Sequence, residues 1–395
     1  MLETSQLLKE RLAAKGPKRI LALDGGGLRG AVTLGFLEKI EATLAERHQH
    51  LIPKKDFRLH HYFDLIGGTS TGSIIAALLA VGGYSVGEIK KMYKDLGGKI
   101  FSDHHGFNLL GKQIYLDRKY DSTPLKEELE KIFGDARLGD NTNKTGLCIV
   151  TKRLDTCSTW PVTNNPNAIY YEENRFFIKE IVRASTAAPS YFEPQLINVG
   201  KEQEGIFVDG GMSIMNNPAL QLFLVATLKG YRLDWKMGEN NLLIVSVGTG
   251  RRDKKLTGNQ WKDPKLWNIA QFAPDQLMSD ANDMVELMMH FIGKGTGVLR
   301  KIDTEVENLS EDILGEQKAC SYVRYNVEMV KDTFDKLGIT NLSEATITNI
   351  MNMDVPANID LLTQIGVAAA GVEVKAAHLP EAFDLKTLEF EHATA

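Results

Sequence analysis

The chain has 395 residues, of which 43% are hydrophobic and 25% are charged, and its formal net charge at pH 7 is −5. This composition is typical of globular proteins and excludes a disordered, collagen-like or coiled-coil chain. The acidic balance argues against a protein that binds nucleic-acid polymers. Three cysteines are too few for a disulfide framework or a structural zinc site.

The N-terminal segment, residues 1–17, has charged residues every few positions and lacks the apolar run of a signal peptide. We expect it to form an arm ahead of the folded domain. The longest apolar stretch, residues 74–81, is far shorter than the ~20 residues that a membrane span needs. The sequence therefore predicts a cytoplasmic protein whose membrane contact is peripheral, at the inner face.

The first 250 residues alternate two kinds of segment. Short apolar runs that end at Asp or Gly are typical of buried strands, and apolar residues at helical spacing are typical of amphipathic helices. In chain order the expected elements are strand 19–23, helix 31–44, strand 62–66, helix 73–81, helix 85–96, a helix that starts at Pro124 with Thr123 as its N-cap, strand 147–151, helix 176–184, strand 206–208 and strand 242–247. This alternation predicts an α/β fold with a mainly parallel sheet that helices cover on both faces.

Residues 97–123 are rich in Gly, His, Asn and Asp and predict a long loop between two core helices. Loops of this length are uncommon unless they are functional or mobile. We expect this loop to act as a lid over a binding site, with residues 104–106 as its flexible centre.

The character of the sequence changes after residue 250. Residues 251–265 are polar. The helical segments that follow are 274–291, 342–351 and 357–372. Because no clean linker separates them from the rest, we interpret residues 251–375 as a helical cap on the same core. This gives one domain over residues 18–375, with its motifs in 18–250, and a C-terminal tail over 376–395.

Residues 68–72, Gly-Thr-Ser-Thr-Gly, match the pattern G-x-S-x-G between an expected strand and an expected helix. A serine nucleophile needs a sharp turn that exposes its hydroxyl, and the flanking glycines remove side chains that would collide across that turn. The pattern is short, and the alternative is a strand-to-helix turn in which Ser70 caps the helix. The strand–turn–helix context favours a nucleophile.

A second glycine-rich loop, DGGGLRG, occupies residues 24–30. The N–H groups of such a loop, leading into a helix, bind an anion, either a phosphate or the oxyanion of a tetrahedral intermediate. Three of its glycines also satisfy G-x-G-x-x-G, but a dinucleotide fold needs a second strand that ends in an acidic residue about 20 residues on. Residues 48–55 are not such a strand. An oxyanion loop is the better interpretation, and we expect Gly26 to adopt a positive φ.

The expected strand 206–208 ends at Asp209, and open α/β sheets place their sites at strand ends. The alternative is an Asp that merely opens a turn. A Ser-His-Asp triad in hydrolase order needs a histidine after the acid. Only His290, His378 and His392 follow Asp209, and none has the loop setting of a triad histidine. The remaining arrangement is a serine activated directly by a carboxylate, which partial burial helps to accept a proton.

Four motifs together resemble those of the patatin-like phospholipases: DGGGLRG at 24–30, GTSTG at 68–72, ASTAAP at 184–189 and DGG at 209–211. They occur in this order and span residues 18 to about 250. The segment SYVRY at 321–325 is similar to a later strand of that family. The combination is far more specific than any one motif.

The resemblance implies a three-layer α/β/α fold and hydrolysis of lipid acyl esters, with no metal and no organic cofactor. It implies a dyad in which Ser70 is the nucleophile and Asp209 is the base. It also implies that three backbone groups form the oxyanion hole, those of Gly25, Gly26 and Gly27. Arg29 matches the motif's basic position, where it either supports the loop or meets a lipid phosphate.

The resemblance also implies partners. The expected substrate is a membrane phospholipid, cleaved to a free fatty acid and a lysophospholipid. Some bacterial members of this size are antiviral effectors that a cyclic dinucleotide activates, which makes such a nucleotide a candidate activator here. The basic cluster 251–255 offers charge for an anionic ligand, although a solvated charge run is commoner. Two alternatives stay open, a nucleotide- or phosphate-binding protein using the loop Gly25–Gly30, and a non-catalytic lipid-binding module.

Overall fold

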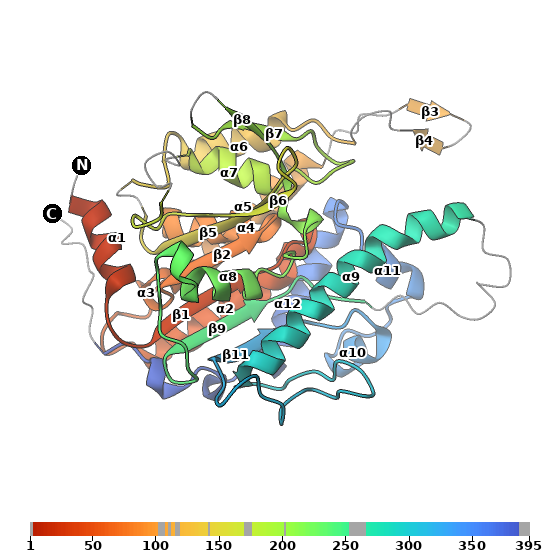
Figure 1. Cartoon of the computed structure of the whole chain (residues 1–395). Helices are drawn as coiled ribbons and strands as arrows, with labels where there is room; N and C mark the ends of the chain where they lie inside the picture. The colour runs from red at the N-terminus through yellow and green to blue at the C-terminus, as the bar shows by residue number, and fades with distance from the viewer. Residues whose placement is uncertain are drawn as a thin grey trace.

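The computed structural model describes residues 3–101, 107–109, 112–114, 119–140, 143–169, 176–200, 203–252 and 266–386, which are built around one central sheet (Figure 1). Within these residues the sheet has nine strands, in the order β10-β11-β9-β1-β2-β5-β8-β7 with β6 paired to β5. Their bounds are β1 Lys18–Leu23, β2 Leu65–Thr69, β5 Gly146–Arg153, β6 Ser158–Thr163, β7 Gln195–Asn198, β8 Glu204–Asp209, β9 Leu242–Val247, β10 Gly293–Gly295 and β11 Cys320–Tyr325. A separate hairpin pairs β3 (Phe107–Leu109) with β4 (Lys112–Ile114).

Helices cover both faces of the sheet, which confirms the predicted α/β fold and its three layers (Figure 1). One face packs against α2 (Gly30–Arg47), α4 (Thr71–Ala77), α5 (Val86–Ile100), α6 (Thr123–Phe133), α7 (Ile178–Ser185) and α12 (Ile359–Glu373). The other packs against α1 (Glu3–Ala13), α8 (Ala219–Thr227) and α9 (Leu266–Ile292). Three further helices are short: α3 (Leu59–Tyr62), α10 (Lys331–Lys336) and α11 (Glu344–Asn349).

The strand that ends at Asp209, β8, runs antiparallel to its neighbour β5. Most neighbouring strands are parallel, as predicted. β8 is instead antiparallel to β5, and Asp209 stands opposite Thr151. In β5 the preceding residue, Val150, is aligned with Thr69 at the end of β2. β8 starts beyond the carboxyl edge of the parallel strands and runs back toward it. Because β8 ends level with the end of β2, Asp209 lies at that edge.

The expected strand 62–66 is wrong by three residues. The segment Leu59–Tyr62 is the short helix α3, and β2 runs over Leu65–Thr69. Gly67 and Gly68, which were expected to end the strand, therefore lie inside it. Their lack of a side chain permits close packing, since a Cβ on Gly67 would lie 2.6 Å from a methyl group of Leu222.

The loop predicted over 97–123 begins later than expected. α5 opens with a capping box formed by Ser85 and Glu88, but it continues to Ile100, whose side chain is buried. Gly97 permits this continuation because its bare Cα packs against the side chains of Leu28 and Ile359. α6 begins at Thr123, one residue before the expected start, and its N-cap is Ser122 rather than Thr123. The proposed flexible centre, residues 104–106, lies outside the described residues.

The C-terminal part does more than cap the core. It supplies β10 and β11 to the central sheet, and β11 confirms the strand expected at 321–325. The expected helix 357–372 is α12, which packs along α2. The two helices cross at glycines, where a Cβ on Gly35 would lie 2.5 Å from the backbone nitrogen of Val367.

The N-terminal arm is a docked helix. Leu8 and Leu12 of α1 are buried in the core on the α8 face, and the Trp235 indole N–H donates to the Leu12 carbonyl at 2.9 Å. At the other end, Arg47 holds the start of the tail through an ion pair with Asp384 at 3.0 Å. Within the described part of the chain, no helix is both long enough and apolar enough to span a bilayer.

Candidate active site

Ser70 lies at the turn between β2 and α4. Its φ of 54° and ψ of −126° form a conformation that L residues rarely adopt outside strained turns. The turn is tight, because a Cβ on Gly68 would overlap the carbonyl group of Gly72. Ser70 occupies the N-cap position of α4, yet its side chain makes no capping hydrogen bond. The geometry matches a nucleophile elbow rather than a capped turn.

Ser185, the last residue of α7, fixes the backbone of this elbow. The Ser70 N–H donates to Ser185 Oγ at 2.9 Å, and the Ser185 hydroxyl donates in turn to the carbonyl of Val150 at 2.7 Å. Ser185 is fully buried, so both hydrogen bonds are shielded from water. One hydroxyl thereby ties the elbow to β5 and leaves the Ser70 side chain to other partners.

Asp209 lies beside the Ser70 hydroxyl, close enough for that hydroxyl to act on the pKa of the Asp209 carboxyl. The Gly211 N–H donates to the Asp209 carboxylate at 2.7 Å. Asp209 is only 5% exposed. Burial raises the pKa of Asp209 to about 6, although the nearby Ser70 hydroxyl and the Gly211 N–H act to lower it. At neutral pH the carboxylate is therefore mostly ionised, yet it gains a proton more readily than an exposed Asp.

The glycine loop 24–30 lies directly beside Ser70. A Cβ on Gly25 would lie 3.1 Å from Ser70 Cβ, and a Cβ on Gly72 would lie 2.7 Å from the carbonyl oxygen of Asp24. The serine, the acid and the loop that the sequence singled out thus converge at the carboxyl edge of β1, β2 and β5.

The N–H groups at the two ends of this loop already have partners. The Gly25 N–H donates to the carbonyl of Asn216 at 3.1 Å, and the Leu28 N–H donates to the carbonyl of Met353 at 2.8 Å. The N–H groups of Gly26 and Gly27 lie between these two. They are the better candidates for an anion site, whereas the Gly25 N–H is engaged in holding the loop.

The expected positive φ is found at Gly27 and not at Gly26. Gly27 has a φ of 56°, while the φ of 166° at Gly26 is extended backbone that any residue adopts. Glycine is needed at position 26 for a different reason, close packing. A Cβ there would overlap Thr249 Oγ1 and lie 2.7 Å from Thr249 Cβ.

The loop after β9, Gly248-Thr249-Gly250, clamps the glycine loop. The Thr249 hydroxyl donates to the carbonyl of Gly25 at 3.1 Å. Arg29 links the two loops as well, since its guanidinium donates to the carbonyls of Gly26 and Gly250, each at 3.4 Å. Of the two roles that the motif allows for Arg29, these contacts favour support of the loop.

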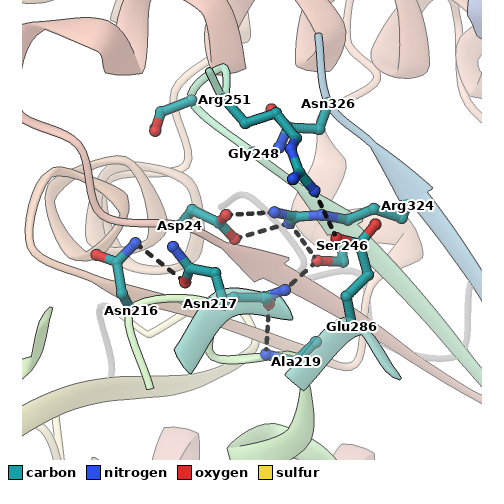
Figure 2. A network of polar contacts seen from close by, with 12 residues as sticks. Asp24, Asn216, Asn217, Ala219, Ser246, Gly248, Arg251, Glu286, Arg324 and Asn326 are labelled. Carbon is teal, nitrogen blue, oxygen red and sulfur yellow. Dashed lines mark hydrogen bonds and ion pairs between the residues drawn. The ribbon is translucent and has the colours of Figure 1, made fainter. Parts of the chain in front are cut away.

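A buried ion pair anchors the start of the glycine loop (Figure 2). Arg324 of β11 donates to both carboxylate oxygens of Asp24, at 2.8 and 2.5 Å, and to Ser246 of β9 at 2.7 Å. The Ser246 hydroxyl continues to Asn217 at 3.3 Å, and Asn217 accepts from the Ala219 N–H that opens α8. The network joins the C-terminal strand to the residue that precedes Gly25.

The histidines after Asp209 are engaged elsewhere. His290 is buried in α9 against the ring of Tyr322. His378 packs against Tyr325, whose hydroxyl lies 3.1 Å from its Nδ1. His392 lies outside the described residues. Residues 48–55 are turns and not a strand, so the nucleotide-binding alternative lacks the second strand that it requires.

Four residues that shape the site had no role assigned from sequence. Ser185 stands in the motif ASTAAP, which was recognised without a role for its serine. Thr249 follows β9 in a Gly-Thr-Gly turn, and Asn216 follows Asp209 within seven positions. Arg324 is a lone charged residue in an apolar strand, a pattern that signals a buried ion pair. Each of these residues stands out in the sequence, but only the fold shows which residue it contacts.

A family model described as "Patatin-like phospholipase" matches residues 21–223, just over half of the chain. The chain is 30% identical over 240 residues to a cGAMP-activated phospholipase of Escherichia coli (strain TW11681), covering 60% of this chain and 64% of that protein. It is 31% identical over 241 residues to a cGAMP-activated phospholipase of Vibrio cholerae, covering 60% and 65%. The chain thus spans slightly less than two thirds of the length of these two relatives.

A third relative matches over more of its length. It is a cUMP-AMP-activated phospholipase of Escherichia coli, 28% identical over 309 residues, which cover 75% of this chain and 84% of that protein. All of the motifs of the candidate site up to Asp209 lie inside the range that the family model matches.

Proposed function

Because the chain belongs to the patatin-like phospholipase family, we propose that it is a serine lipid acyl hydrolase that uses a Ser70–Asp209 dyad. The observation that supports this proposal most is that the Ser70 hydroxyl, at a strained strand-to-helix turn, lies beside the buried Asp209 carboxyl and acts on its pKa. The bonds expected to break are the acyl esters of membrane phospholipids.

In the proposed first step, Ser70 Oγ attacks the ester carbonyl while its proton passes to Asp209. The N–H groups of Gly26 and Gly27 stabilise the oxyanion of the tetrahedral intermediate. Its collapse breaks the ester bond, leaves the fatty acyl group on Ser70 and sends the proton from Asp209 to the lysophospholipid. Water then attacks the acyl-enzyme, again with Asp209 as base, and releases the free fatty acid.

The environment of Asp209 suits a base without a histidine. Burial destabilises the carboxylate and makes it a stronger proton acceptor than an exposed Asp, and it has a pKa of about 6. A base with a pKa near the working pH combines a large ionised fraction with a sufficient driving force for proton transfer.

Apolar side chains near the site suit a lipid substrate. Met212 and Ile214, just after Asp209, are each 55% exposed. On α9, whose Asn282 contacts Asn216 at 3.4 Å, Leu277 and Met284 are 68% and 54% exposed. We propose that these side chains contact the acyl chains of a membrane surface, and that this surface is the inner face of the cytoplasmic membrane.

The names of the bacterial relatives suggest a control signal. Three of them are described as activated by cGAMP or cUMP-AMP. We propose that a cyclic dinucleotide likewise activates this chain, in antiviral defence. The direct test is hydrolysis of a panel of phospholipids and lysophospholipids, with and without 3′,3′-cGAMP and cUMP-AMP. Release of fatty acid supports the proposal, and no release from any ester under any condition refutes it.

Gly26→Val is expected to reduce kcat far more than it changes KM. The added side chain overlaps Thr249 and displaces the Gly26 N–H from the oxyanion. Loss of one such donor typically costs ~3 kcal/mol of transition-state stabilisation, or roughly 100-fold in rate. Steady-state kinetics on a soluble ester measure the effect, with Gly98→Val, a glycine with open space around its Cα, as the control. An unchanged kcat would mean that the loop has another role.

Ser185→Ala is expected to lower kcat about 10-fold to 100-fold while the protein stays folded. Without Ser185 Oγ the Ser70 N–H loses its acceptor, and the elbow is no longer tied to β5. Ser185→Thr keeps a hydroxyl and should restore part of the rate. If neither substitution alters kcat, the elbow does not need this support.

A further inference from the structure

Tyr93 of α5 contacts both halves of the candidate active site. Its hydroxyl donates to the carbonyl of Gly27 at 2.5 Å and lies 2.7 Å from the hydroxyl of Thr71, the residue after Ser70. A hydroxyl carries one proton and a carbonyl only accepts, so in the second contact the Thr71 hydroxyl donates to Tyr93. One side chain of α5 therefore joins the glycine loop to the turn that carries Ser70.

The contact is buried and closely fitted. Tyr93 is 5% exposed and Thr71 is 4% exposed. Burial raises the pKa of Tyr93, so its hydroxyl keeps its proton at the working pH. A Cβ on Gly30 would lie 2.5 Å from the Tyr93 hydroxyl oxygen and 2.9 Å from Thr71 Oγ1. The φ of −55° at Gly30 suits any residue, so the last glycine of the loop is needed to make room for the tyrosine hydroxyl.

The peptide group between Gly27 and Leu28 is held at both of its polar atoms. Tyr93 holds the carbonyl, and the Leu28 N–H donates to the carbonyl of Met353 at 2.8 Å. Because a peptide group is planar, these two contacts fix its orientation. Gly27 itself has a φ of 56° and no side chain, so sterics within the loop restrain it little. The direction of the Gly27 N–H therefore depends on contacts that come from outside the loop.

The position of this N–H matters for the proposed reaction. An oxyanion donor is effective when it is held in place before the attack, so that no reorganisation is needed as charge develops. The oxyanion forms next to Ser70, and Thr71 directly follows Ser70. A side chain that holds Thr71 and the Gly27 carbonyl together thus fixes the donor relative to the nucleophile.

We propose that Tyr93 is a positioning residue that holds the Gly27 N–H in place relative to Ser70 and so raises the rate of acyl transfer without touching the substrate. The inference rests on the proposed hydrolase function and assigns a role to a residue outside the four motifs. The oxyanion exists only during the reaction and not in the bound substrate. Loss of the Tyr93 contact should therefore lower kcat and leave KM unchanged.

Tyr93→Phe keeps the buried ring and removes the hydroxyl. The fold should survive, because the Gly27 carbonyl still accepts from the Gly30 N–H. We expect kcat on a soluble ester to fall roughly 10-fold to 100-fold, by the same factor from pH 5 to pH 8, because the base Asp209 is untouched. Tyr84→Phe, at a half-buried tyrosine just before α5, is the matched control and should keep full activity. Melting temperatures check that both variants are folded.

Thr71 provides a second, independent test of the same contact. Thr71→Val removes its hydroxyl and should lower kcat, and Thr71→Ser keeps a hydroxyl and should recover part of the loss. The double variant of Tyr93→Phe and Thr71→Val should be about as fast as Tyr93→Phe alone, since the phenylalanine has already removed both hydrogen bonds. Losses that multiply would mean that the two residues act separately, which contradicts the proposal.

Hydrogen exchange measured by mass spectrometry reports on the loop without turnover. We expect the peptide that contains residues 24–30 to exchange faster in Tyr93→Phe and unchanged in Tyr84→Phe. An unchanged kcat or unchanged exchange in Tyr93→Phe overturns the positioning role, and so does faster exchange throughout the protein, which would mark a purely structural role. If the unmodified protein hydrolyses no ester while Tyr93→Phe speeds exchange in this peptide alone, the contact with the loop stands and the hydrolase function is refuted.

Discussion

Ser70→Ala is expected to lower ester hydrolysis by at least ~10⁴-fold, because removal of a nucleophile leaves only binding and oxyanion stabilisation. The fold should survive, since the Ser70 side chain makes no capping hydrogen bond and the Ser185 contact uses the backbone N–H. The measurement is fatty acid release with saturating cyclic dinucleotide, together with the melting temperature.

A matched control keeps this result specific. Ser310 is an exposed serine in a loop between β10 and β11, and Ser310→Ala should keep full activity. Turnover by Ser70→Ala near that of the control would show that another residue attacks the ester.

Asp209→Asn is expected to reduce kcat by roughly 10³-fold to 10⁴-fold, because the amide keeps the shape of the base and cannot accept the proton. In the unmodified protein, kcat/KM should rise with pH to half its plateau near pH 6, where the carboxyl with a pKa of about 6 ionises. Rates measured from pH 5 to 8 give the profile, with Asp56→Asn, an exposed acid, as control. A profile without an inflection near 6, or a fully active Asp209→Asn, would assign the base elsewhere.

Asp209→Asn, which lowers the rate, is expected to raise the stability of the folded protein at neutral pH. The folded pKa of Asp209, about 6, lies above its ordinary value of 3.8, so folding favours the protonated form. The stabilisation is complete below pH 3.8 and is lost as pH rises through 6, which amounts to about 3 kcal/mol. Asparagine is neutral throughout, so the stability of Asp209→Asn relative to the unmodified protein should increase from pH 4 to pH 8. Denaturant unfolding at both values measures it.

The order of elements and the convergence of the motifs could be predicted from sequence, because apolar runs that stop at glycine or aspartate mark strand ends. β9 coincides with the expected 242–247, and the glycine loop and Ser70 follow neighbouring parallel strands. The direction of β8 could not be predicted this way. A strand pattern states which residues are buried and not whether a strand enters the sheet parallel or antiparallel.

The sequence also could not show why a glycine is needed at position 26. Gly26 was expected to need a positive φ, but its backbone is extended and the constraint is Thr249, more than 200 positions away in the chain. The pairing of Asp24 with Arg324 is of the same kind. Such contacts depend on which strands become neighbours in the sheet. A sequence motif can predict a contact between two of its own residues, but not a contact with a residue elsewhere in the chain.

Covalent labelling tests the central claim, that Asp209 activates Ser70, most directly. A fluorophosphonate probe is incubated with the protein at several pH values, and the modified peptide is identified by mass spectrometry. We expect the label on Ser70, a rate of labelling that rises through pH 6, no label on Ser70→Ala, and labelling of Asp209→Asn at least 100-fold slower. A label on a different serine, or equally fast labelling of Asp209→Asn, would contradict the account.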